Sequence, residues 1–195
     1  AFLDELRHDL NERMVGSDAP LFTYSVTIQN HQAYGYGKYD ERPAPVPLSV
    51  SVSDGAMEQL SVYMEGVRDS SEMLVALTQY LDTLDEPTVL VFFGDHRPNL
   101  GTACTELGLR YNLNETPQET VDTYAVPYVI WSNEAYASAV DLPARYAALA
   151  LPENGYLSDN YLGAMVLQLI GYHGQSAFFD ELNALRAELP VLRER

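Results

Sequence analysis

The segment TVLVFFGDHRP, Thr88–Pro98, decides the fold and carries the most informative polar side chains. Residues Thr88–Phe93 form a nearly continuous apolar run, so both faces of a strand made from them should be covered. This pattern predicts a central strand of a parallel sheet. Gly94 then lets the chain turn at low cost, and Pro98 fixes its exit.

Asp95 and His96 lie where this predicted strand ends. In open α/β sheets, ligands bind beyond the carboxyl ends of the strands, and a carboxylate with a neutral imidazole suits Zn²⁺ or Mn²⁺. The alternative is that Asp95 caps a turn and His96 is an ordinary surface residue, since a metal needs more than these two ligands. From these two residues alone, both interpretations stay open.

Asn30 and His31 follow a second predicted strand, Leu21–Ile28, which is rich in β-branched and aromatic residues. The His31 ring could contact a phosphate or sulfate oxygen of a substrate, but taken alone it fits better as a loop residue bonded to backbone. The tyrosines of Tyr34–Tyr39 could line a polyol or sugar site, although such a segment is more often a packed surface loop.

Helical periodicity and a third β-rich run complete the fold prediction. Apolar spacing predicts helices over Phe2–Met14 and Ala56–Leu81, the second with a candidate break near Asp69–Ser71. Thr123–Ile130 predicts a strand in which Pro127 indicates an edge or a bulge. Further helices are expected at residues 103–111, at 160–172 with Ser158 or Asp159 as N-cap, and at 177–189.

These patterns predict an α/β fold in one domain. The strands Leu21–Ile28, Thr88–Phe93 and Thr123–Ile130 should lie in one sheet with helices on both faces. A chain of 195 residues can build such a core without a second domain.

The composition excludes several classes of protein. The chain has 11 Lys+Arg against 28 Asp+Glu, a net charge of −17, which argues against nucleic-acid partners and anionic membrane surfaces. Its one cysteine, Cys104, excludes an intrachain disulfide and a Cys-rich zinc site. No apolar run is long enough to span a membrane.

Several stretches together resemble one family. The segments FTYSVTIQNH, DEPTVLVFFGDHRPNL, YAVPYVIWSN, LSDNYLGAMVLQLIGY and FFDELNALRAELPV stand in an order that resembles the lipoteichoic acid synthases. These are phosphoglycerol transferases of the sulfatase/alkaline phosphatase superfamily. The resemblance runs from about Phe2 to Val191 and implies an alkaline phosphatase-like sheet.

The resemblance also implies residue roles. In the family a divalent metal, typically manganese, is held by an upstream acidic residue, a threonine nucleophile and an Asp-His pair, and the pair corresponds to Asp95 and His96. The substrate-contacting histidine corresponds to His31. The threonine attacks a phosphodiester, and the glycerophosphoryl group then passes to an acceptor hydroxyl. The expected partners are a phosphoglycerol-bearing lipid and a polyol or glycan acceptor.

The upstream acidic ligand and the threonine motif have no counterpart in this sequence. We therefore expect residues 1–195 to be the C-terminal portion of the catalytic domain, lacking the N-terminal part of the sheet and inactive alone. In the parent protein the resemblance implies a cell-membrane location, with upstream membrane-spanning segments and an extracytoplasmic catalytic domain. An uncovered sheet edge would favour a homodimer of this portion.

Two alternatives remain at this stage. A hydrolase of phosphate or sulfate esters in the same superfamily would use water as the acceptor, and no motif in this chain separates transfer from hydrolysis. A non-catalytic binding domain that retains the fold is the other alternative.

Overall fold

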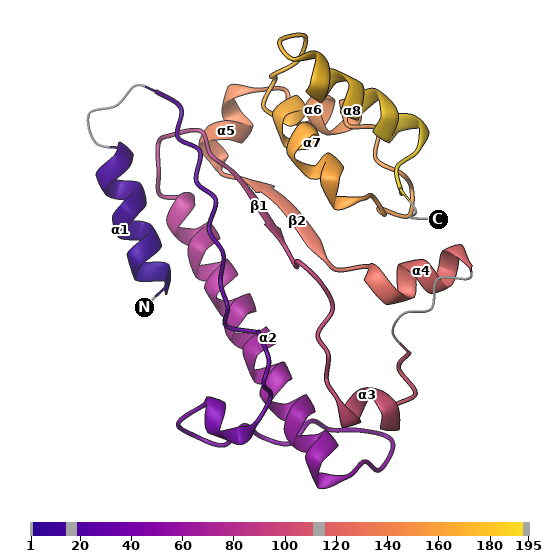
Figure 1. The fold of residues 1–195 in the computed structure, drawn as a ribbon. Coiled ribbons are helices and arrows are strands. Elements are labelled where there is room, and N and C mark those ends of the chain that lie inside the picture. The colour runs from indigo at the N-terminus through magenta and orange to yellow at the C-terminus, as the bar shows by residue number, and fades with distance from the viewer. Residues whose placement is uncertain (1, 15–18, 111–115, 193–195) are drawn as a thin grey trace. The chain divides into compact units, whose positions relative to one another are not determined.

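The computed structural model describes residues 2–14, 19–110 and 116–192, which form helices and one small sheet (Figure 1). The chain divides into two compact units, residues 1–80 with 96–124 and residues 81–95 with 125–195. The first unit contains α1 (Phe2–Met14), η1 (Tyr36–Lys38), α2 (Asp54–Leu81, except for its last residue), α3 (Thr102–Glu106) and α4 (Pro117–Tyr124). The second contains β1 (Val89–Phe93), β2 (Tyr128–Ser132), α5 (Glu134–Ala139), α6 (Leu142–Ala148), η2 (Asp159–Tyr161), α7 (Leu162–Leu169) and α8 (Ala177–Glu188).

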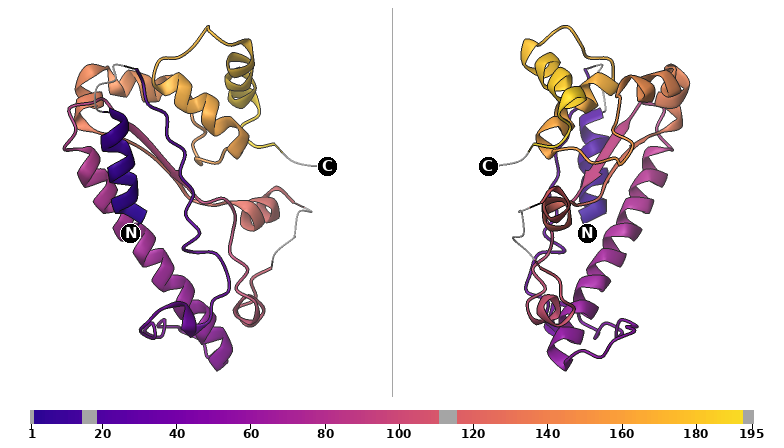
Figure 2. Two further views of the ribbon diagram at one scale, coloured as in Figure 1. Left: turned by 60° about the vertical axis from the view of Figure 1, so that its left-hand side comes forward. Right: turned by 90° about the vertical axis from the view of Figure 1, so that its right-hand side faces the viewer.

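The long helix α2 organises the first unit, and α1 lies beside it (Figure 2). The Arg7 guanidinium donates to the carbonyl of Ala76 at 2.9 Å, and the Tyr80 hydroxyl donates to Asn11 at 2.8 Å. The candidate break near Ser71 is absent, and α2 is continuous. The Ser71 hydroxyl donates a hydrogen bond to the carbonyl of Val67 at 2.8 Å, so its polar group is satisfied within the helix.

The core of the first unit forms where the first half of α2 meets α3 and the loop before α2. It consists of Tyr34, Ala56, Leu60, Val62, Leu100, Ala103 and Cys104. Tyr36 and Tyr39 pack against this core, and Tyr34 meets Tyr63 edge to face at 5.6 Å. The tyrosine segment is therefore a packed loop, as the simpler interpretation expects.

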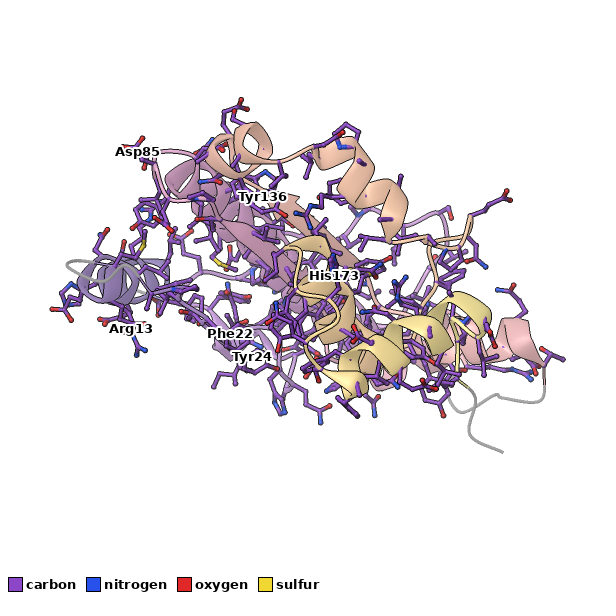
Figure 3. The ribbon with its side chains drawn as sticks, turned by 90° about the horizontal axis from the view of Figure 1, so that it is seen from above. Arg13, Phe22, Tyr24, Asp85, Tyr136 and His173 are labelled. Carbon is purple, nitrogen blue, oxygen red and sulfur yellow. The ribbon has the colours of Figure 1, made fainter. Side chains whose placement is uncertain are left out.

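Leu21–Ile28 is extended but belongs to no strand, so its predicted place in the sheet is wrong. Its large apolar side chains are exposed: Phe22 by 85%, Tyr24 by 68% and Ile28 by 80% (Figure 3 labels the first two). A strand needs a neighbour to pair its backbone groups, and β-propensity supplies none.

The second unit is built on a two-stranded antiparallel ribbon. Val89 pairs with Ser132 and Phe93 with Tyr128, and Val91 faces Ile130 at the centre. The predicted central position in a parallel sheet is therefore wrong for β1, which has one strand partner in the described part of the chain. Pro127 lies just before β2, where its missing N–H costs no ladder hydrogen bond.

One face of this ribbon packs against helices of the same unit. Leu149, Leu162, Met165 and Leu169 form the buried cluster there, and the ribbon side chains on it are Val89, Val91, Phe93, Tyr128 and Ile130. These ribbon residues alternate along each strand, as expected when one face of a strand is covered. The apolar run of β1 is continuous in sequence, but only alternate side chains of it pack on this cluster.

Asn133 joins the ribbon to its surroundings and is fully buried. Its Oδ1 accepts from the backbone N–H of Thr88 at 2.9 Å and of Tyr136 at 3.0 Å, which caps α5. Its amide donates to three backbone carbonyls, those of Leu81, Leu84 and Glu86, at 2.9–3.3 Å. One side chain therefore fixes the approach to β1 and the start of α5.

The C-terminal helices largely follow their periodicity. The prediction over 160–172 is realised as η2 followed by the shorter α7, and the prediction over 177–189 as α8. Ser158 is the N-cap of η2, but its hydroxyl accepts from Leu192 N rather than capping by side chain. The mixed α/β class is confirmed. Among the described residues, no helix is long and apolar enough to cross a membrane.

Candidate functional site

The chain leaves β1 at Gly94 and bends at Asp95 and His96. The Gly94 N–H donates to the carbonyl of Pro127 at 3.2 Å, which extends the ribbon by one hydrogen bond. A Cβ at Gly94 would lie 3.3 Å from the Cβ of Val126, and φ at Gly94 is not positive. A side chain at Gly94 would therefore crowd Val126, and this close approach, rather than the turn expected from the sequence, is what the structure shows at this glycine.

The orientation of the His96 ring fits a metal ligand. Its Nδ1 lies 2.9 Å from the carbonyl oxygen of Arg97. In the neutral ring, Nδ1–H donates to that oxygen, and the lone pair then remains on Nε2. Metal-bound histidines commonly fix their tautomer in this way. In this tautomer, Nε2 is the ring atom of His96 that can bind a metal.

Asp95 and His96 are exposed and supply a carboxylate and an imidazole, donors that suit manganese or zinc. In the parts of the chain that the structure describes, no group of three or more His, Cys, Asp or Glu side chains could hold a metal ion. The residues fit a metal site as a partial set of ligands. Their assignment as ligands stays a prediction.

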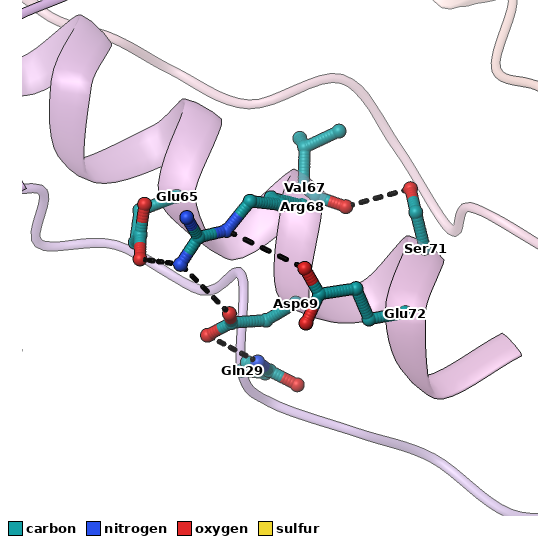
Figure 4. A network of polar contacts seen from close by, with 7 residues as sticks. All are labelled: Gln29, Glu65, Val67, Arg68, Asp69, Ser71 and Glu72. Atoms are coloured by element: carbon teal, nitrogen blue, oxygen red, sulfur yellow. Dashed lines mark hydrogen bonds and ion pairs between the residues drawn. The ribbon is translucent and has the colours of Figure 1, made fainter. Parts of the chain in front are cut away.

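His31 stands at the end of a segment that is tied to α2. The amide of Gln29 donates to Asp69 at 3.1 Å, and Asp69 also belongs to the charged network around Arg68 (Figure 4). The amide of Asn30 donates to the Ser70 hydroxyl at 3.1 Å. These contacts fix the chain directly before His31.

Gly66 on α2 allows this attachment. A Cβ at Gly66 would lie 2.0 Å from Oδ1 of Asn30, which leaves no room for any other residue. Oδ1 of Asn30 is buried and has no hydrogen-bond partner within the structure. The Asn-His pair is visible in the sequence, but the glycine that makes room for it lies 36 residues later, and no local signal connects the two.

The His31 ring repeats the arrangement of His96. Its Nδ1 lies 2.7 Å from the carbonyl oxygen of Gln32, and its backbone N–H donates to Ile28 at 3.1 Å. The ring is bonded to backbone, as the simpler interpretation expects. The neutral tautomer with Nδ1–H leaves Nε2 as an acceptor, and protonation makes Nε2 a donor to an anion.

His31 also lines a cavity in the first unit that is wide open to solvent and has a volume of about 620 Å³. Most of its wall is apolar or glycine, and the polar side chains on it are His31, Gln32 and Lys38. The Lys38 ammonium donates to the carbonyl of His31 at 2.5 Å and lies 5.4 Å from the centre of the Tyr34 ring. Burial lowers the pKa of Lys38. No motif in the sequence marks Lys38, although it is the only lysine in the chain.

Arg97 places a positive charge near Tyr63 in the first unit. Burial raises the pKa of the Tyr63 hydroxyl, and the positive charge of Arg97 partly opposes that rise. Arg97 is exposed at the surface, directly after His96. It adds a cation next to the predicted ligand.

Comparisons with known proteins identify the chain's relatives. The sequence profile described as Sulfatase matches residues 2–172. A protein of Rhizobium meliloti (strain 1021), described as "Putative cyclic beta-1,2-glucan modification protein", is 26% identical over 151 residues, which cover 74% of this chain and 23% of that protein. The chain thus matches about a quarter of the length of this relative. No solved structure shows a significant match.

Proposed function

This chain belongs to the sulfatase family, and from that membership we propose that it is part of an enzyme that transfers phosphoglycerol, or a related phosphodiester group, to an acceptor hydroxyl. The observation that carries the proposal is the exit of β1, where Asp95 precedes a histidine whose Nδ1 is bonded to backbone. A carboxylate beside a prepared Nε2 donor is typical of a divalent metal site.

Asp95 and His96 would hold the metal, and the remaining ligands would come from residues outside this chain. A divalent metal, which we propose to be Mn²⁺, supplies Lewis-acid stabilisation of charge on the phosphoryl oxygens. The Arg97 carbonyl keeps the His96 ring in its ligating tautomer. His31 would contact the substrate from the end of the segment tied to α2.

The nucleophile in this proposal is a threonine outside residues 1–195, so the chain alone should not turn over phosphodiesters or sulfate esters. It should also bind Mn²⁺ weakly, because two donors are too few for tight coordination. Calorimetry on the chain tests this expectation. Micromolar or tighter binding that Asp95→Ala abolishes would mean that residues 1–195 hold a complete site.

The acceptor in this proposal is a glycan. The Rhizobium relative is named for modification of cyclic β-1,2-glucan, and glycan hydroxyls are suitable acceptors for a phosphoglycerol group. The donor would be a phosphoglycerol-bearing lipid. We further propose that the whole protein is membrane-bound and presents this domain outside the cytoplasm.

The test uses the full-length protein that carries this chain, with a phosphoglycerol lipid donor, a glucan acceptor and Mn²⁺. We expect phosphoglycerol on the glucan, and Asp95→Asn should lower turnover by a factor of about 10²–10⁴ by removing a metal ligand. Asp85→Asn is the matched control, because Asp85 is also an exposed carboxylate in a short loop (Figure 3).

Each outcome separates the alternatives. Free glycerol phosphate without glucan product would identify a hydrolase that uses water. No turnover of either kind, by a protein that is folded and loaded with metal, would favour a non-catalytic domain. Equal activity of Asp95→Asn and Asp85→Asn would refute the assignment of the metal site.

A further inference from the structure

The cavity at His31 carries a positive charge that the proposed chemistry does not yet use. The chain has a net charge of −17 and a single lysine, and that lysine lines this cavity. A cationic side chain in this cavity is not expected from the composition alone, since anionic side chains outnumber cationic ones by more than two to one. The position of Lys38 therefore calls for a chemical reason.

We propose that Lys38 binds an anionic oxygen of the substrate, a phosphate or sulfate oxygen, beside His31. The substrate role of this site rests on the proposed function, whereas the site itself rests on the geometry of the cavity. The ammonium lies 2.5 Å from the carbonyl of His31, so it is fixed next to the residue that carries the imidazole. An ammonium has three N–H donors, and the contact with His31 uses one of them.

The surroundings of Lys38 favour an external anion over an internal one. Burial is the cause of its lowered pKa, and no carboxylate of the described residues opposes that effect through its charge. Glu58 approaches the same loop, but its Oε1 accepts from the backbone N–H of Tyr36 at 2.7 Å. A partly buried ammonium without a counterion is stabilised when an anion binds.

The rest of the wall indicates what the anion is attached to. Ile28 and Ala33 offer apolar surface, and Gly35 and Gly37 offer bare backbone. The carbon chain of a small polyol such as glycerol can pack on that surface while its phosphate meets Lys38 and His31. The cavity therefore fits a phosphorylated polyol better than free phosphate.

The single lysine gives a direct test. Selective ¹³Cε labelling of lysine leaves the Lys38 ammonium unmodified and gives a single lysine signal, which is identified by its loss in Lys38→Arg. We expect glycerol 3-phosphate to shift this signal and to raise the pKa of Lys38, inorganic phosphate to do so more weakly, and glycerol to have no effect. The titrations are run at matched ionic strength with chloride, so that general screening is constant.

Substitutions separate binding at Lys38 from a general charge effect. Lys38→Gln should weaken binding of glycerol 3-phosphate by calorimetry by about tenfold or more, because a charged hydrogen bond is lost. Lys38→Arg should retain most of the affinity. Arg42→Gln is the matched control, since it removes one positive charge from the same loop, where Arg42 stacks on the Tyr36 ring at 4.0 Å and does not line the cavity.

The outcomes distinguish this inference from the proposed function. Unchanged affinity in Lys38→Gln, or an equal loss in Arg42→Gln, would overturn the role of Lys38 even if turnover depends on Asp95. A lysine signal that responds to glycerol 3-phosphate while Asp95→Asn leaves turnover unchanged would retain the anion site and overturn the proposed metal chemistry.

Discussion

Leu21–Ile28 and Val89–Phe93 were both expected to be strands but have different structures. Both are short and rich in β-branched and aromatic residues, and each is followed by a histidine. Val89–Phe93 pairs with β2 and places alternate side chains on a helical core, whereas Leu21–Ile28 is extended, unpaired and exposed. The difference shows that β-propensity describes a segment that is able to pair, and that a neighbour must be present to make it a strand.

The two segments are also anchored differently. Asn133 binds the backbone of the residues directly before β1, and one face of β1 packs on buried leucine and methionine side chains. Leu21–Ile28 is held at its end, where Gln29 and Asn30 bind α2. If anchoring determines stability, substitutions at β1 and its anchor should cost more than substitutions within Leu21–Ile28.

The largest effect is expected at Asn133. Asn133→Ala leaves several buried backbone groups without their partner and should lower the free energy of unfolding by about 3 kcal/mol. Urea unfolding followed by Trp131 fluorescence measures it, because the only tryptophan lies on β2. Asn154→Ala, which removes one exposed contact to Tyr156 N, should change stability little. Equal losses in the two variants would contradict the role assigned to Asn133.

The next effect concerns self-association, which stays a prediction from the sequence. If the exposed apolar row of Leu21–Ile28 pairs with a second copy, Phe22→Lys should weaken dimerisation by about tenfold or more. The substitution replaces an aromatic ring that the dimer would bury with a charged side chain. Sedimentation equilibrium measures the dissociation constant. Phe178→Lys on α8 is the control, since Phe178 is 66% exposed in the other unit. A chain that stays monomeric at all concentrations would contradict dimerisation.

A matched pair of valines compares the two segments directly. Val91→Ala in β1 should cost about 1 kcal/mol, because Val91 packs on the core of the second unit. Val26→Ala should change stability by less than about 0.5 kcal/mol, because Val26 is 65% exposed. A cost at Val26 as large as that at Val91 would show that Leu21–Ile28 is packed in solution.

The smallest effect is a pH dependence in the first unit. The hydroxyl and backbone N–H of Ser53 donate to Glu106 and lower the pKa of its carboxyl. A lowered pKa in the folded state contributes stability above the unfolded pKa, and this contribution is lost as the pH falls through the folded pKa. Glu106→Gln should therefore make unfolding less pH-dependent in the acidic range. Urea unfolding at pH values from about 3 to about 7 measures this change, because this range covers the titration of ordinary carboxyl groups. Parallel profiles for the two proteins would contradict it.

The sequence predicted local structure better than pairing. Helix α1 matches its predicted bounds, and α2 begins two residues earlier than predicted, because a 3.6-residue period is a local property. The helices α5 and α6 were missed, although Asn133 and Asp141 cap them and are recognisable capping residues. Strand partners depend on residues far away in the sequence, which explains the errors at Leu21–Ile28 and in the direction of β1.

The candidate site was also partly predictable. A glycine before Asp95 and His96 indicated that the chain leaves the strand there, and the structure confirms the bend. Lys38 could have been noticed as the only lysine of an acidic chain, but its contact with the His31 carbonyl spans seven residues of irregular loop. Periodicity gives no information in such a loop, so the cavity was visible only in three dimensions.

The most direct test of the central claim is paramagnetic broadening of histidine ring signals by Mn²⁺ in the full-length protein that carries this chain. If Asp95 and His96 hold the metal, the His96 signals should broaden at low Mn²⁺. Asp95→Asn should restore the sharp His96 signals at the same Mn²⁺ concentration. His96 signals that stay sharp while Mn²⁺ supports turnover, or broadening that Asp95→Asn does not change, would contradict the account.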